Sequence, residues 1–185
     1  KPSLPSGIIE GQNLHTLLSE LTVPVHNITD FNKLPIPFRC LATDIATGER
    51  VVLQEGNLAT AMRASMSIPS VFTPVRIGNR LLVNGAVVRN FPVQDVKDMG
   101  ADLVIGVFVS SDLEPEEELT ALTDILMQSA WVLSAYDTRE QTKMADIYVA
   151  PQLEEYSSGS FNNIPDIIAR GKAKGSEFTP AFTRL

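Results

Sequence analysis

The sequence predicts an α/β fold, in which helices cover the faces of a sheet. Short apolar runs typical of strands alternate along the chain with segments whose apolar residues recur at helical spacing. Residues 101–110 (ADLVIGVFVS) form an almost unbroken apolar run, typical of a central parallel strand that is buried on both faces. The chain has no internal repeat and no Pro/Gly/Ser-rich linker, so its 185 residues are expected to form one domain.

The first half of the chain predicts two helices and two hairpins. Leucines at helical spacing predict a helix over residues 13–21, with Asn13 as its N-cap. Asn57 is expected to cap a second helix, which ends before Ile68-Pro69. β-branched residues around a Thr-Gly-Glu turn and around Gly-Asn predict the hairpins, with strands at residues 37–47 and 50–54, and at 75–77 and 80–83.

The second half predicts further alternation of helix and strand. Residues 92–99 are expected to form a helix that ends at Gly100, immediately before the buried strand. Apolar periodicity predicts the longest helix over residues 119–136. A short strand at residues 146–150 and a last helix around residues 164–168 complete the pattern.

Composition excludes several classes of function. The chain has 22 Asp and Glu against 15 Lys and Arg, a net charge of -7, which disfavours nucleic-acid binding. Cys40 is the only cysteine, so no internal disulfide can form. The spacing of His15 and His26 does not indicate a metal site or a catalytic triad, and we expect no cofactor.

The chain shows no targeting or membrane-spanning segment. Its longest apolar run is far shorter than the roughly 20 residues that a transmembrane helix needs. Residues 1–7 contain neither an initiator Met nor the apolar core of a signal peptide, so we expect the chain to begin in mid-protein. Its compartment stays open.

Two neighbouring segments carry a family resemblance, residues 64–72 (ASMSIPSVF) and residues 81–93 (LLVNGAVVRNFPV). Together they resemble patatin-like phospholipases, and in detail the bacterial members. That family has an Ala-Ser-x-x-x-Pro-x-x-Phe stretch before a strand that ends in Asp-Gly-Gly or Asp-Gly-Ala, followed by an Asn-x-Pro turn. The similarity extends from Leu34 to Val104. It implies the later part of a three-layer α/β/α sheet whose N-terminal strands are missing here.

The resemblance also implies a catalytic mechanism. Patatin-like enzymes cleave acyl esters of lipids with a Ser-Asp dyad, whose Ser lies in a Gly-x-Ser-x-Gly turn. The position that matches the Asp is Asn84, an amide that cannot hold a proton as a carboxylate does. The matching motif residues are Gly85, Ala86, Asn90 and Pro92.

No other residue offers a convincing nucleophile or base. The chain contains no Gly-x-Ser-x-Gly, and the serines of residues 64–67 lack the flanking glycines. Asp44 precedes a Thr-Gly turn, where an Asp usually binds backbone, so we favour a structural role over one as a substitute base. Cys40 is interpreted as a small buried apolar group.

Three functional hypotheses follow. The leading one is a portion of a patatin-like lipid acyl hydrolase, inactive as this chain because the nucleophile is absent and Asn84 replaces the base. One alternative is a non-catalytic module that binds a lipid. Another is half of an assembly that completes its sheet with a partner chain, and self-association is expected because unpaired strands and uncovered apolar faces favour it.

Overall fold

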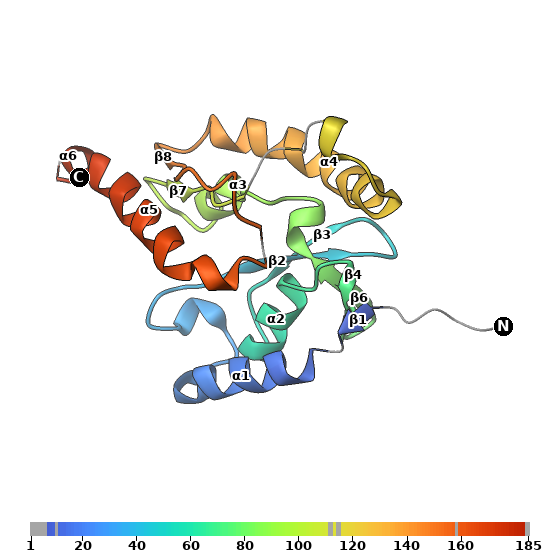
Figure 1. Cartoon of the computed structure of the whole chain (residues 1–185). Coiled ribbons are helices and arrows are strands. Elements are labelled where there is room, and N and C mark those ends of the chain that lie inside the picture. Colours follow the sequence, from blue (N-terminus) through green and yellow to red (C-terminus); the bar gives the residue numbers. More distant parts are fainter. Residues whose placement is uncertain (1–6, 10, 111–112, 114–115, 158, 184–185) are drawn as a thin grey trace. The chain divides into compact units, whose positions relative to one another are not determined.

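A computed structural model describes residues 7–9, 11–110, 113, 116–157 and 159–183 of the chain (Figure 1). Helices and strands alternate along it, which confirms the predicted α/β fold. The backbone divides into two compact units, residues 1–90 and residues 91–185. The prediction of one patatin-like domain over residues 1–185 stays a prediction.

The first unit contains a four-stranded antiparallel sheet with the strand order β3-β2-β6-β5. Both predicted hairpins are present in it, β2 with β3 and β5 with β6. Gly78 has a φ of 59° in the turn between β5 and β6, a conformation that glycine adopts without cost. The four strands span Cys40–Asp44 (β2), Arg50–Leu53 (β3), Val75–Ile77 (β5) and Arg80–Asn84 (β6).

The same unit has a second, two-stranded parallel sheet that the sequence did not predict. It pairs β1 (Gly7–Ile9) with β4 (Ser70–Phe72). These strands are separated by some sixty residues in the chain, and pairing between strands so far apart leaves no local signal.

Two helices pack against each other in the first unit, α1 (Gln12–Thr22) and α2 (Leu58–Ser65). The predicted cap of α2 is confirmed, since the side chain of Asn57 accepts a hydrogen bond from the Thr60 N–H at 2.8 Å. The prediction for α1 was wrong, because Gly11 and not Asn13 occupies the N-cap. Gly11 has a φ of 76°, which side chains rarely adopt, and a β-carbon there would require the Arg63 guanidinium to shift.

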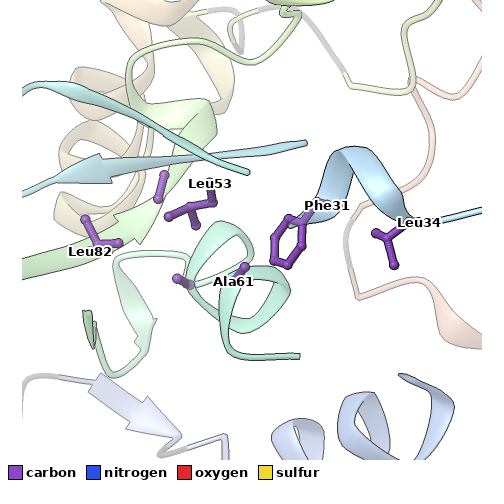
Figure 2. Packing of buried hydrophobic residues seen from close by; sticks show 7 residues of the cluster. Phe31, Leu34, Leu53, Ala61 and Leu82 are labelled. Atoms are coloured by element: carbon purple, nitrogen blue, oxygen red, sulfur yellow. The ribbon is translucent and has the colours of Figure 1, made fainter. Parts of the chain in front are cut away.

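The core of the first unit lies between α2 and the four-stranded sheet. Figure 2 shows Leu53 of β3 and Leu82 of β6 beside the helix that carries Ala61, with the Phe31 ring close by. Phe31 belongs to the short 3-10 helix η2 (Phe31–Lys33) and is fully buried. This packing holds the end of β6, where the motif residues lie.

The second unit is built around a parallel pair of strands, β7 (Ile105–Val107) and β8 (Ile147–Val149). Phe91 lies edge-on to the rings of Phe108 and Tyr148, with both centroid distances 5.7 Å. Gly106 leaves room for the Phe91 ring. The α-helices of the second unit span Val93–Lys97 (α3), Leu122–Thr142 (α4), Ile164–Glu177 (α5) and Thr179–Phe182 (α6).

The apolar run at residues 101–110 differs from its prediction. It pairs in parallel as expected, but only Ile105–Val107 form a strand, and only one face of that strand is buried. Gly106 faces the Phe91 ring, whereas a row of alternate side chains is exposed, namely Leu103, Ile105, Val107 and Val109. An apolar sequence therefore indicated which residues favour burial, but not whether a covering layer is present.

Candidate functional site

The backbone of Asn84 is fixed at the last position of β6. Asn84 pairs with Ala42 of the neighbouring strand β2. Its N–H donates to the Ser67 carbonyl at 2.9 Å, and its carbonyl accepts from the Thr43 hydroxyl at 3.1 Å. The strand therefore presents the side chain of residue 84 from a well-held position.

The side chain of Asn84 closes a turn with the residues that follow it. Its Oδ1 accepts a hydrogen bond from the Ala86 N–H at 2.8 Å and thereby caps the 3-10 helix η3 (Gly85–Val87). An Asn or an Asp forms such a turn equally well, because the turn uses one acceptor oxygen. The second polar atom of the side chain, Nδ2, is a hydrogen-bond donor and not a proton acceptor.

Gly85 allows two backbone segments to approach each other. It is buried, and a β-carbon at this position would lie 2.6 Å from the Leu41 carbonyl carbon and 2.8 Å from the Leu41 Cβ, and closer still to the carbonyl oxygen. Such a separation is far below ordinary contact, so only glycine fits. The Asn-Gly pair thus has a structural reason at each of its two positions.

The remaining motif residues continue the chain beyond this turn. Ala86 supplies the N–H that Asn84 binds, and the Arg89 N–H donates to the Gly85 carbonyl at 2.9 Å. Asn90 is exposed at the end of the first unit. Pro92 belongs to the second unit, where it precedes α3. The roles predicted for these residues stay predictions.

Ser67, one of the serines nearest to the expected nucleophile motif, has other partners. Ser67 is fully buried, and its hydroxyl donates to the Arg63 carbonyl at 2.7 Å while it accepts from the Arg63 guanidinium. Arg63 also donates to the Thr73 carbonyl at 3.3 Å and lies over the Phe72 ring at 4.8 Å. The two hydrogen bonds between Ser67 and Arg63 hold Ser67 in place just after the end of α2, which is a structural role.

Arg63 is the feature of this region that the sequence analysis missed. It is buried, and this burial lowers the pKa of its guanidinium. Alanines that flank it in α2 are also buried, at positions 59, 61 and 64. Their small size was the available signal, since it indicates a helix packed closely on all sides.

The other candidate side chains have structural surroundings. Asp44 is buried, and its Oδ1 accepts from the Ala46 N–H at 3.1 Å, which confirms the structural interpretation. His15 lies within 3.3 Å of the Thr60 hydroxyl, between α1 and α2. Burial raises the pKa of the Cys40 thiol to about 11, so little of it is a reactive thiolate at neutral pH.

The described residues contain neither a cluster of metal-binding side chains nor a membrane-spanning helix. Within the ranges that the structure describes, no group of three or more His, Cys, Asp or Glu side chains is arranged to hold a metal ion. None of the helices in that part of the chain is both long enough and apolar enough to cross a membrane.

The α/β fold and the turn at Asn84 agree with the class that the motifs predicted, a domain of the lipid hydrolase type. A family model described as patatin-like phospholipase matches residues 3–97, slightly more than half of the chain. The chain belongs to the patatin-like phospholipase family. The family resemblance predicted from the sequence is therefore confirmed.

Curated relatives extend this result. An uncharacterised NTE family protein of Mycobacterium tuberculosis (strain ATCC 25618 / H37Rv) is 34% identical over 107 residues, which cover 57% of this chain and 29% of the relative. The lysophospholipase NTE1 of Pyricularia oryzae is 24% identical over 169 residues, 77% of this chain and 11% of the relative. The lysophospholipase NTE1 of Kluyveromyces lactis is 24% identical over 208 residues, 90% of this chain and 14% of the relative. The chain thus spans less than a third of the length of each of these relatives.

Proposed function

We propose that this chain carries the base position of a patatin-like lipid acyl hydrolase, a site that cleaves acyl esters of phospholipids or related lipids. The observation that carries the proposal is the geometry of Asn84. One side-chain oxygen is bound by the Ala86 N–H at 2.8 Å, while the second polar atom is not used by the turn. A side chain held in this way presents its second atom in a defined direction.

The chemistry of that second atom decides whether the site can act. In an Asp, one carboxylate oxygen would accept the Ala86 N–H and the other could take the proton of a serine hydroxyl. In Asn84 the second atom is an NH₂ group, which donates hydrogen bonds and takes no proton near neutral pH. We therefore expect Asn84 to maintain the turn without acting as a base.

The nucleophile is the second requirement. The sequence contains no Gly-x-Ser-x-Gly, and the buried Ser67 hydroxyl is bound to Arg63. A serine hydroxyl also needs preorganised N–H donors for the developing oxyanion. We propose that the 185-residue chain by itself hydrolyses no ester.

The test combines a carboxylate at position 84 with an added nucleophile segment. The chain and its Asn84→Asp variant are each assayed with a short-chain p-nitrophenyl ester, alone and with a patatin-like segment that carries Gly-x-Ser-x-Gly and its glycine-rich loop. Because residues of one catalytic unit are not additive, we expect hydrolysis only from Asn84→Asp with the segment. Asn79→Asp is the matched control, since it makes the same chemical change at an exposed position of the first unit that lies outside the motif.

Two results would contradict the proposal. One is hydrolysis by the unaltered chain that a serine-directed inhibitor abolishes. The other is equal activity of Asn84→Asp and Asn79→Asp in the presence of the segment. Peptide mass must verify fresh Asn84 in each sample, because the Gly85 nitrogen can attack the unhindered Asn84 amide and convert it slowly to Asp or isoaspartate.

The amide at position 84 also favours a second candidate, a non-catalytic module that binds a lipid or completes its sheet with a partner chain. Such a module would keep the turn, which Asn and Asp form equally, without needing a base. Retention of a fatty-acyl ester by the chain without turnover would favour it. Failure of Asn84→Asp to gain activity with any nucleophile segment would favour it as well.

A further inference from the structure

The C-terminal helix α5 (Ile164–Glu177) has an apolar face that is exposed. Residues three and four positions apart share one face of a helix, and Ile164, Ile168, Gly171 and Gly175 follow this spacing. Ile164 and Ile168 are 46% and 51% exposed. None of the fourteen residues of α5 is buried. Phe161 extends the apolar surface immediately before the helix, and its side chain is 74% exposed.

The opposite face of α5 is the one that contacts the protein. Arg170 donates to the Gln152 carbonyl at 3.1 Å, forms an ion pair with Glu155, and lies 4.9 Å from the centre of the Tyr156 ring. One turn earlier, Asp166 accepts a hydrogen bond from the Tyr156 hydroxyl. Asp166 and Arg170 also pair with each other at 3.5 Å. These polar contacts attach the helix to the loop at residues 152–156.

The exposure of these isoleucines differs from the usual arrangement of a surface helix. A surface helix of a globular protein normally buries its apolar stripe and exposes its charged side chains. In α5, Arg170 and Asp166 contact the loop although Asp166 is itself 57% exposed, and Ile164 and Ile168 are exposed as well. The helix therefore presents an apolar surface to whatever lies outside the second unit.

The distribution of charge along the chain indicates what kind of surface the exposed face of α5 contacts. Residues 161–185 contain four Lys or Arg and two Asp or Glu, whereas residues 1–160 contain eleven and twenty. The segment with the exposed apolar face is thus positive in an otherwise acidic chain. Lys172 and Lys174 lie on the two sides of the apolar face, at the positions from which long side chains reach the headgroups of a membrane.

We infer that α5 is an interfacial helix that lies on a phospholipid surface, with Ile164 and Ile168 among the acyl chains and the two lysines towards anionic headgroups. A helix with one apolar face and flanking lysines is typical of this mode of binding. Lys174 also pairs with Glu177 at 2.8 Å, so the apolar contact should outweigh the electrostatic one. The inference goes beyond the proposed hydrolysis and does not depend on Asn84.

The experiment measures binding of the full chain to vesicles by flotation. Vesicles of phosphatidylcholine are compared with vesicles that also contain phosphatidylglycerol. We expect binding to both and tighter binding to the anionic ones. Ile168→Asp should bind at least roughly tenfold more weakly. The variant loses one isoleucine that would be buried among the acyl chains and brings a charge to the acyl region. The helix content of this variant, measured by circular dichroism, should stay unchanged, because Ile168 is not buried within the protein.

Leu133→Asp provides the matched control, since Leu133 is an even more exposed apolar side chain, at 77%, and lies on a different helix, α4. It should bind vesicles within about twofold of the unaltered chain. Lys172→Glu should lower the preference for phosphatidylglycerol and leave binding to phosphatidylcholine nearly unchanged. Light scattering of the same proteins tests the rival occupant, a second copy of the chain.

Three outcomes would overturn the inference. The unaltered chain could fail to float with either vesicle, or Leu133→Asp could lose as much binding as Ile168→Asp. In the third, Ile168→Asp would reduce the molecular mass in solution and leave vesicle binding unaltered, which would assign the face to self-association. None of these readouts uses ester hydrolysis, so they do not test the proposed enzymatic function.

Discussion

Replacement of Gly85 by alanine should destabilise the chain strongly, because its new methyl group has no space. The β-carbon would lie 2.6 Å from the Leu41 carbonyl carbon. Leu41 cannot easily move away, since it belongs to the inner strand β2 and is paired with Val52 of β3. Relief would have to come from displacement of backbone on both sides, which places the cost at about 3 kcal/mol, the upper end of the range for overpacking.

A loss of that size is measurable. For a chain of 185 residues, about 3 kcal/mol corresponds to a fall of roughly 6–12 °C in the melting temperature. Urea unfolding followed by circular dichroism would give the same difference as a free energy.

Gly78→Ala is the control, because it makes the same change in the same sheet where no atom lies within 4 Å of the new carbon. Its positive φ should cost only about 1–2 kcal/mol. If Gly85→Ala were as stable as Gly78→Ala, the close approach of Leu41 would not explain the glycine.

Two further predictions concern the thiol and the exposed strand. Because burial raises the pKa of Cys40 from 9.0 to about 11, the folded thiol keeps its proton to higher pH than the unfolded one. This contribution to stability is complete below pH 9 and is lost as the pH rises to about 11. In urea unfolding, the free energy of unfolding of the unaltered chain should therefore fall by up to about 2–3 kcal/mol more than that of Cys40→Ala over this interval. Parallel curves for the two proteins would contradict it. The exposed row on β7 should promote self-association, so Val107→Lys should lower the mass measured by light scattering. Ile45→Lys, with similar exposure outside that row, should not, and an equal effect of both changes would refute a role for β7.

Local elements could be predicted from the sequence because their causes are local. The turn at Gly78-Asn79 and the cap at Asn57 depend on residues only a few positions apart. Gly11 was missed as the N-cap of α1 because its conformation and its contact with Arg63 depend on another helix. The pairing of β1 with β4 was missed for the same reason, as it joins segments far apart in the chain.

Less of the candidate site could be predicted than of the fold. The motif identified Asn84 and Gly85, but the reason for the glycine lies in Leu41, which is on a different strand. The apolar run before Ser110 predicted a strand with two buried faces, yet alternate side chains such as Val107 are exposed. Hydrophobicity measures how much a side chain favours burial, whereas burial itself requires a covering segment.

The turn at Asn84 separates two properties that a sequence motif combines. Position 84 must supply an oxygen to the Ala86 N–H, and Gly85 must leave space for Leu41, whether or not any ester is cleaved. An alanine at position 84 would remove the turn's acceptor together with the amide, at a cost of about 1 kcal/mol, and would confuse a structural loss with a catalytic one. Asn84→Asp keeps the acceptor and changes only the second atom, from a donor nitrogen to an oxygen that takes a proton. A difference in hydrolysis between the Asn84 and Asp forms can therefore be assigned to proton transfer, because both residues supply the acceptor oxygen that the turn needs.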